Sequence, residues 1–257
     1  MAVLGAKGGV GTTCTVLGLA EAAAQQGLRV CALDLDPRAT LTTALEGAID
    51  GPTLKDVLRL DQRAVALNDA IVPASWQGIW LSPAERTLQN RERDMGTVQA
   101  RARFRQRLDS ARPDWDLILI DLVSGLGNLT LAGIVAADVL LITSSASQWA
   151  VAGVHETVYT LDRLAKTHPA TATLGGVAVT LYDGTAGAKG VLTELSEAFG
   201  HLLLSPPVPR YAAVHLAAEA HHMPLRTYAH TAPLRAREAL RVADIYTEFL
   251  TRMLTVT

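Results

Sequence analysis

Residues 5–13 read GAKGGVGTT, and this stretch decides how the chain begins to fold. A short apolar run precedes it at residues 2–4, and an alanine-rich segment with helical periodicity follows it at residues 12–26. Glycines at such a strand-to-helix turn let backbone N–H groups point inward, and the helix N-terminus adds a positive dipole end. The stretch therefore predicts a phosphate-binding loop. A glycine-rich turn that holds no ligand is the alternative that the loop alone leaves open.

Short apolar runs and helical segments alternate along the rest of the chain. Because uninterrupted apolar strands separated by helices are typical of a parallel sheet covered on both faces, we expect an α/β fold with a doubly wound, mainly parallel sheet. No linker, repeat or charged tail breaks the pattern, so we expect residues 1–257 to form one domain. The expected strands lie at residues 29–33, 78–81, 117–120, 139–142, 177–181 and, more weakly, 202–204. The expected helices lie at residues 97–112, 129–136, 150–166, 187–199, 211–222 and 234–254.

Aspartates follow two of the apolar runs. Asp34 and Asp36 come directly after the second run, and Asp121 ends a later one. Because ligands bind at the carboxyl ends of the strands in an open parallel sheet, we expect these carboxylates to lie beside the glycine loop. Thr13 occupies the position at which the pattern G-x-x-x-x-G-K-[ST] carries a Mg²⁺-binding hydroxyl. Strand-end aspartates also cap helices, so a purely structural role is the alternative.

The composition excludes several classes of protein. A hydrophobic fraction of 49% with 19% charged residues excludes a disordered chain. No apolar run reaches the roughly 18 residues that a membrane-spanning helix needs, and residues 1–15 lack the pattern of a secretory signal. We therefore expect a cytoplasmic protein. Cys14 and Cys31 are too few for a zinc site or a disulfide framework.

Taken together, these segments resemble the ParA/MinD family of deviant Walker ATPases, and ParA-type partition proteins most of all. The resemblance covers essentially the whole chain. The glycine loop at residues 7–11 is similar to the deviant Walker loop, DLDP at residues 34–37 to the second motif, and residues 116–121 to the Walker B strand. Segments similar to ParA in particular are TLKDVL at 53–58, AIVP at 70–73, AAD at 136–138, LYDG at 181–184 and VPR at 208–210.

The resemblance implies a homodimer that forms with ATP and Mg²⁺ and that is switched by conversion to ADP. Lys7 is implied to cross the dimer interface to the partner's phosphates, and Asp36 to position the hydrolytic water. Thr13 and Asp121 are implied to hold Mg²⁺. The implied nucleotide-binding residues are Gly8, Gly9, Val10, Gly11, Thr12 and Thr13 at the phosphates, with Tyr182, Asp183 and Pro209 lining the adenine pocket.

The sequence departs from the family pattern at three places near the phosphates. Thr12 stands where the family has its loop lysine, residues 38–40 read RAT instead of QGN, and residues 122–124 read LVS instead of a CPP-like stretch. A charge-assisted hydrogen bond contributes about 1.5–3 kcal/mol, so its loss predicts nucleotide binding weakened by roughly 10- to 150-fold. Lys7 and Arg38 are the cations that could offset this loss. We expect ATP hydrolysis to be slow or absent.

Two basic segments suggest nonspecific DNA binding, which the resemblance to ParA also implies. Residues 86–112 carry eight arginines against three acidic residues, and residues 208–241 carry five against two. Such segments can neutralise phosphates, although a solvated helix face is the alternative. The second arginine of the family after Pro-Arg is absent, with His215 near its place. The candidate DNA contacts are Arg210, Arg235 and Arg237, and with less weight Arg101, Arg105 and Arg112.

Three functions are compatible with the sequence, and they differ in the partners that they require. The first is a switch for plasmid or chromosome partitioning or positioning, with a ParB-like or other activator protein and with nucleoid association if DNA binds. The second is a non-hydrolysing scaffold of the pilus, secretion or cellulose-synthesis type. The third, metal-cluster or reductase chemistry, is disfavoured by the two cysteines. The last helix mixes acidic and basic residues, so we expect no membrane binding.

Overall fold

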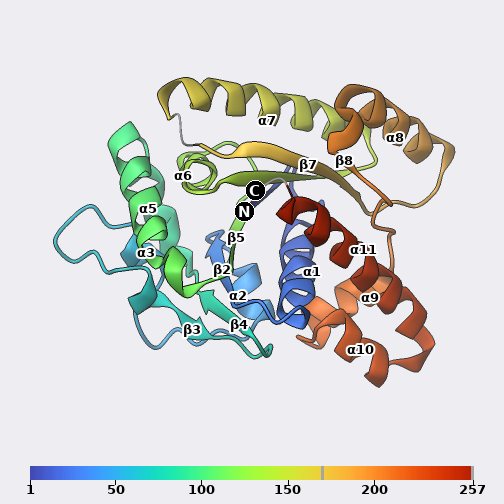
Figure 1. Cartoon of the computed structure of the whole chain (residues 1–257), viewed down its shortest axis with the longest axis horizontal. Helices are drawn as coiled ribbons and strands as arrows, with labels where there is room; N and C mark the ends of the chain where they lie inside the picture. Colours follow the sequence, from blue (N-terminus) through green and yellow to red (C-terminus); the bar gives the residue numbers. More distant parts are fainter. Residues whose placement is uncertain (169–170, 256–257) are drawn as a thin grey trace.

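The computed structural model describes residues 1–168 and 171–255 and shows an α/β fold around one sheet of eight strands (Figure 1). The strand order is β3-β4-β2-β5-β1-β6-β7-β8. All neighbouring strands are parallel except β3 and β4, so the expected doubly wound, mainly parallel sheet is confirmed. The strands are β1 Ala2–Gly5, β2 Val30–Leu35, β3 Val72–Pro73, β4 Ile79–Ser82, β5 Leu117–Leu122, β6 Val139–Ser145, β7 Thr173–Thr180 and β8 Leu203–Leu204.

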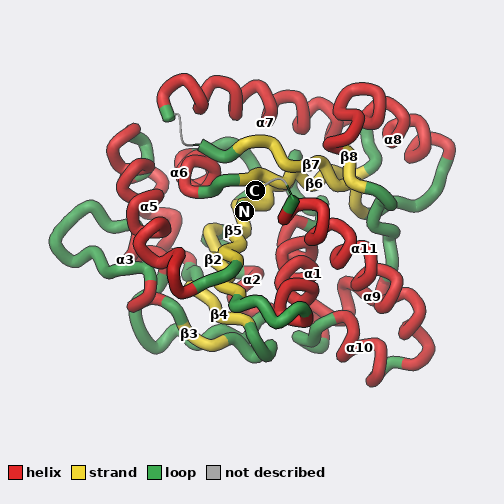
Figure 2. Tube along the Cα trace, viewed as in Figure 1, coloured by secondary structure: helices red, strands yellow, loops and turns green. Residues whose placement is uncertain are grey.

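Helices cover both faces of the sheet (Figure 2). Alternating strand residues point to opposite faces, so Val3 joins one apolar core while Ala2 and Leu4 join the other. The core that contains Val3 includes α1, α9, α10 and α11, and the second core includes α5, α6, α7 and α8. The α-helices are α1 Thr12–Gln25, α2 Thr40–Ala44, α3 Leu54–Val57, α4 Arg91–Asp94, α5 Val98–Ala111, α6 Asn128–Ala136, α7 Gln148–Thr167, α8 Ala186–Phe199, α9 Ala212–His215, α10 Leu225–Thr231 and α11 Ala236–Leu254.

The helix that follows the glycine loop is fixed by close packing against the last helix. A Cβ atom on Gly18 of α1 would meet the Tyr246 ring of α11 at 2.0 Å, so this position accepts only glycine without a shift. Tyr246 is fully buried and lies edge-on to Phe249. This contact holds the N-terminal end of α1, and with it the loop, in a fixed place on the sheet.

The structure differs from the sequence prediction near the C-terminal third. The helix expected at residues 211–222 is α9 followed by a π-helical turn, Leu216–Ala220. The last helix was expected from residue 234, but a 3₁₀ turn at Pro233–Arg235 precedes α11. Pro224 and Pro233 lack the N–H that continues a helix, so the chain breaks around them and forms α10 between them. No helix in the described part of the chain is long and apolar enough to cross a membrane.

Candidate functional site

The glycine loop takes a conformation that its sequence demands. Gly9 and Gly11 both have φ of 75°, in the left-handed region that favours glycine. A Cβ on Gly5 would meet the Thr12 hydroxyl oxygen at 2.5 Å. The hydroxyl of Thr180 on β7 donates to the Val10 carbonyl oxygen at 2.6 Å and so anchors the loop to the sheet. The two glycines and the Thr180 contact therefore fix the shape of the loop.

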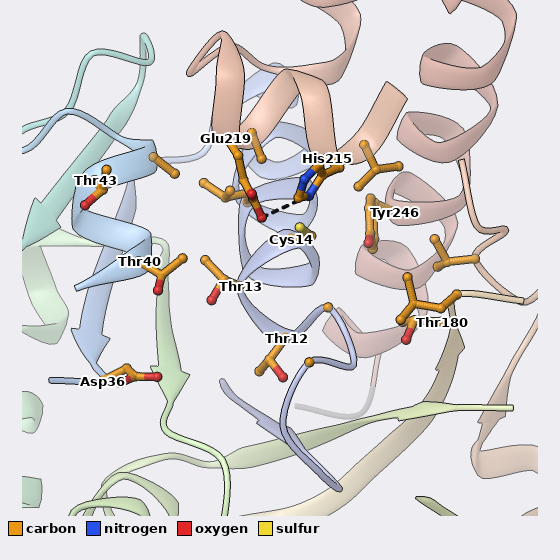
Figure 3. A pocket seen from close by; sticks show the side chains of 18 of the residues that line it. Thr12, Thr13, Cys14, Asp36, Thr40, Thr43, Thr180, His215, Glu219 and Tyr246 are labelled. Atoms are coloured by element: carbon orange, nitrogen blue, oxygen red, sulfur yellow. Dashed lines mark ion pairs between the residues drawn. The ribbon is translucent and has the colours of Figure 1, made fainter. Parts of the chain in front are cut away.

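The two threonines that begin α1 point to different partners. The Thr13 hydroxyl donates to Asp121 Oδ2 at 2.7 Å, so the predicted pair is in direct contact. The Thr12 hydroxyl lies 3.2 Å from the hydroxyl of Thr143 on β6. Thr12 also lines the cavity above the loop (Figure 3). A neutral, short side chain thus fills the position where a lysine would carry charge into the cavity.

The three aspartates lie together at the carboxyl ends of β2 and β5 but differ in their partners. Both oxygens of the Asp34 carboxylate are hydrogen-bonded within the chain. They accept from the Thr42 hydroxyl at 2.7 Å, from Thr42 N at 2.8 Å and from Asp36 N at 3.2 Å. Burial raises the pKa of Asp34 to about 6. Asp34 pairs with Asp121 in the sheet register, which brings the two carboxylates to one edge.

Asp121 combines deep burial with a carboxylate oxygen that has no partner in the described structure. It is 1% exposed, and its Oδ1 atom is buried without a hydrogen-bond partner in the described structure. Burial, followed by the nearby charge of Asp34, raises the pKa of Asp121 well above its usual range. A buried carboxylate oxygen beside a threonine hydroxyl is the donor set that Mg²⁺ takes. The residues present therefore fit a divalent cation at Thr13 and Asp121.

Asp36 is covered by Arg38, two residues further along the chain. The Arg38 backbone N donates to Asp36 Oδ1 at 2.9 Å, and the guanidinium Nη2 donates to Oδ2 at 2.7 Å. The Nε atom reaches both carboxylate oxygens, at 3.3 and 3.0 Å. The Asp36 side chain is 6% exposed whereas that of Arg38 is 67% exposed. The carboxylate that the resemblance assigns to the hydrolytic water is thus occupied by an arginine.

A cavity of about 720 Å³ is lined by Thr13, Asp36 and Arg38, whereas Asp34 and Asp121 are not among the described residues that line it. Its volume lies within the roughly 300–1,000 Å³ typical of small-molecule sites. The loop and α1 form one end, α2 forms a side, and α9 with the π-helical turn closes the other side (Figure 3). Sequence reasoning missed the His215–Glu219 ion pair at 3.0 Å on this wall, because a mixed helical segment gives no signal of facing a ligand.

The predicted adenine-binding segments lie side by side. Tyr182 N donates to the Val208 carbonyl at 3.0 Å, and Arg210 N donates to the Tyr182 carbonyl at 2.9 Å. Pro209 lines the cavity, and Leu181 does so in place of its neighbours Tyr182 and Asp183 among the described residues. Asp183 is exposed, and its carboxylate accepts from the hydroxyl and the N–H of Thr185.

Lys7 lies at the top of the loop with its side chain exposed. It is not among the described residues that line the cavity of its own chain. This placement lets the side chain reach away from the molecule, as contact with a second copy would require.

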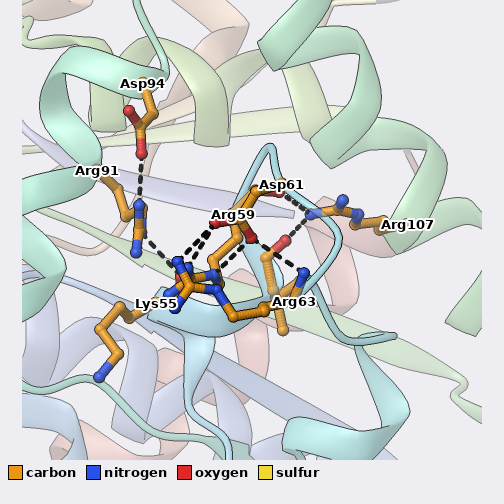
Figure 4. Close-up of polar contacts among 8 residues, drawn as sticks. Lys55, Arg59, Asp61, Arg63, Arg91, Asp94 and Arg107 are labelled. Carbon is orange, nitrogen blue, oxygen red and sulfur yellow. Dashed lines mark hydrogen bonds and ion pairs between the residues drawn. The ribbon is translucent and has the colours of Figure 1, made fainter.

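Most arginines of the first basic segment, residues 86–112, form hydrogen bonds or ion pairs within the chain. Arg105 and Arg112 both bond to Asp138 Oδ1 at 2.8 Å, and Arg105 also donates to the Ala137 carbonyl at 2.7 Å. Arg101 donates to the Met95 carbonyl and to Asn128. Arg91 pairs with Asp94, and Arg107 donates to the carbonyl of Val57 at the end of α3 and to that of Arg59 just after it (Figure 4). These arginines hold α4, α5 and α6 together, which weighs against a DNA role for them.

In the second basic segment Arg226 bonds to Asp244, and two further arginines have partners. Arg210 and Arg237 are exposed, and Arg235 is half-buried with Glu238 at 3.2 Å. Arg241 is also exposed and donates to the Tyr211 hydroxyl at 3.2 Å. Arg235 lies at the end of the 3₁₀ turn before α11, and Arg237 in the first turn of that helix. Arg210 and Arg237 are therefore available at the surface, as is Arg103 on α5.

The comparisons with known proteins agree with this geometry. Residues 1–173 match the family AAA_31, described as an AAA domain. The chromosome partitioning protein ParA of Caulobacter vibrioides is 29% identical over 220 residues, which cover 83% of this chain and 81% of that protein.

Two solved structures share the fold over nearly the whole chain. A Cyanothece McdA variant in complex with ATP has a TM-score of 0.85 at 20% identity, covering 99% of this chain and 96% of that one. Cobyrinic acid a,c-diamide synthase from Mycobacterium smegmatis, with a bound ATP analog and magnesium, has a TM-score of 0.77 at 26% identity, covering 98% and 93%.

Proposed function

Because the chain belongs to the ParA/MinD family of P-loop ATPases through its AAA_31 domain, we propose that it is an ATP-binding switch that dimerises when loaded and acts in partitioning or positioning. One observation carries the proposal: the glycine loop, the Thr13–Asp121 contact at 2.7 Å and the cavity meet at one edge of the sheet. Together they provide sites for a triphosphate, its Mg²⁺ and a base.

The phosphate end of the proposed site is preformed. The N-terminus of α1 and the loop N–H groups attract anions, and Thr13 with Asp121 would hold Mg²⁺. The ion supplies positive charge against the phosphate oxygens. The base would lie toward Pro209 and Leu181, at the far end of the cavity. ATP and ADP, the proposed nucleotides, would differ in how far the phosphate tail reaches toward Asp36.

Calorimetric titration with ATP tests this function. Binding in Mg²⁺ is expected to weaken by at least about 10-fold in EDTA, because a lost charge-assisted contact costs about 1.5–3 kcal/mol. Asp121→Asn should produce a similar loss in Mg²⁺ while keeping its contact with Thr13. Asp162→Asn, on the exposed side of α7, is the control and should bind like the wild type. Binding that is indifferent to both EDTA and Asp121→Asn would contradict the proposed site.

We propose further that the loaded dimer binds duplex DNA without sequence preference, through Arg210, Arg235 and Arg237. Exposure of Arg210 and Arg237 supports this, and a two-fold dimer would present the surface twice. Phosphate contacts release counterions, with a slope of about −0.9 per contact in log affinity against log salt. Affinity should therefore fall steeply with salt.

The double substitution Arg235→Glu/Arg237→Glu is expected to weaken DNA binding roughly 10-fold or more and to lower the salt slope by about 2. Fluorescence anisotropy with ATP–Mg²⁺ measures both. The matched control, Arg163→Glu/Lys166→Glu, makes the same charge change on exposed positions of α7, across the sheet from α11 (Figure 1). Equal losses in both variants would mean that net charge, and not this surface, governs binding.

The second candidate function is the non-hydrolysing scaffold. The Arg38 guanidinium on Asp36 favours it, since this carboxylate has no free oxygen for a water in the structure. Absence of DNA binding at low salt with ATP–Mg²⁺ present would make the scaffold the better account. If the chain is a partitioning switch, its proposed protein partner is a ParB-like or other activator protein. If it is a scaffold, its proposed partner is a protein of the apparatus that it organises.

A further inference from the structure

The phosphate end of the cavity is unusually poor in positive charge. Asp36 lines this end of the cavity, and Asp121 lies next to it through its contact with Thr13, which also lines the cavity. A triphosphate would bring further negative charge into this space. Of the described residues that line the cavity, Arg38 is the one lysine or arginine. His215 already pairs with Glu219 on the opposite wall.

We propose that Arg38 is the phosphate-binding cation of this site and that it exchanges Asp36 for the nucleotide's phosphate tail, which uncovers the Asp36 carboxylate. This inference rests on the proposed ATP-binding function. Arg38 would make the contact to the phosphates that the family's loop lysine makes, because Thr12 stands in the place of that lysine. The exchange also makes the availability of Asp36 depend on an occupied phosphate site.

The geometry permits the exchange. The Arg38 side chain is 67% exposed and bonds only to Asp36 among the hydrogen bonds of the described chain, so the guanidinium is largely solvated, whereas the Asp36 side chain is 6% exposed. A guanidinium offers the same two-pronged contact to a carboxylate or to a phosphate. The exchange therefore gives the guanidinium another partner of matching shape, and the contact to phosphate has to offset the ion pair that the buried Asp36 carboxylate loses.

The backbone keeps Asp36 in place when the guanidinium leaves. Arg38 N donates to Oδ1 at 2.9 Å, and Ala39 N donates to the Asp36 carbonyl at 2.8 Å, in a tight turn. Oδ2, by contrast, receives only the guanidinium atoms Nε and Nη2. Departure of the guanidinium would thus free Oδ2 while Oδ1 stays anchored. An oriented carboxylate with one free oxygen is what the positioning of a water requires.

The first test compares ATP with AMP in calorimetric titrations of full-length variants. Arg38→Ala is expected to weaken ATP binding by roughly 10- to 150-fold, the loss of one charge-assisted contact, and to change AMP binding by less than about 2-fold. Arg38→Lys should recover part of the loss, and Thr12→Lys added to Arg38→Ala should recover most of it. A purely structural role would lower ATP and AMP binding alike and would overturn the proposal.

The chain contains a matched control for this variant. Arg63 lies two residues after Asp61, donates its backbone N to Asp61 Oδ1 at 3.0 Å and its Nη2 to Oδ2 at 3.1 Å, and is 79% exposed (Figure 4). The contacts within this pair match those of Arg38 with Asp36, and neither Arg63 nor Asp61 is among the described residues that line the cavity. Asp61 differs in being 48% exposed and in also binding Arg59. Arg63→Ala should leave ATP binding unchanged, and the unfolding transition of Arg38→Ala in denaturant should show that this variant is folded.

A double-mutant cycle tests the exchange itself. Removing the competing carboxylate by Asp36→Asn should tighten ATP binding by at least about 2- to 5-fold, the strength of an ion pair whose guanidinium is solvated. In the Arg38→Ala background the same change should have a smaller effect, because no competition remains. Equal effects in both backgrounds would show simple repulsion by Asp36 and overturn the exchange. Failure of the wild type to bind ATP overturns the proposed function as well, whereas normal ATP binding by Arg38→Ala overturns this inference alone.

Discussion

Thr12→Lys is expected to tighten ATP binding by roughly 10- to 150-fold, because a lysine at this position adds a charge-assisted contact to the phosphates. The Thr12 hydroxyl contributes only a neutral contact with Thr143 at 3.2 Å. Thr12 lines the cavity, so the longer side chain has space to extend toward the phosphates. Calorimetry gives the affinity, and steady-state turnover is expected to rise from a slow or absent rate.

A surface lysine serves as the control. Thr193→Lys makes the same chemical change on an exposed position of α8 and should alter neither affinity nor turnover. A brisk wild-type rate that Thr12→Lys leaves unchanged would mean that another cation already supports hydrolysis. Arg38 is then the first residue to examine, since it lies in the same cavity.

Lys7→Ala is expected to abolish the ATP-induced dimer at concentrations where the wild type dimerises. Lys7 is exposed at the top of the loop and does not line its own cavity. Truncating one partner of a desolvated, hydrogen-bonded charge pair costs about 2–5 kcal/mol, which weakens the dimer by roughly 30-fold or more. ATP binding to one chain should change little, because the contact is made to the partner's nucleotide.

Sedimentation velocity with ATP–Mg²⁺ measures this change. Lys189→Ala removes another exposed lysine, on α8, and should dimerise like the wild type. A Lys7→Ala protein that still doubles its mass with ATP would show that the loop lysine does not bridge the two copies. A variant that no longer binds ATP at all would place Lys7 within its own site instead.

The parallel sheet could be predicted from the sequence because each of its main strands is a continuous apolar run. The apolar runs give the parallel strands, and the residues after them give Asp34, Asp36 and Asp121. The two-residue strand β3 was missed because so short a segment has no periodicity of its own. It is a strand only through its antiparallel pairing with β4, which begins a few residues later in the chain.

The site was predictable in its residues but not in its partners. The contact of Thr13 with Asp121 follows from a strand end facing a helix start. That Arg38 covers Asp36 depends on a turn whose shape no motif specifies. The arginines of α5 were equally ambiguous, because a run of charge does not reveal that Asp138 and backbone carbonyls lie within reach.

The most direct test of the central claim is the mass of the wild-type chain in solution with and without nucleotide. Sedimentation velocity should show a monomer without nucleotide and with ADP, and a dimer of twice that mass with ATP and Mg²⁺. EDTA should return the dimer to monomer. A single mass under all four conditions, at concentrations where calorimetry shows ATP to be bound, would contradict an ATP-dependent dimerising switch.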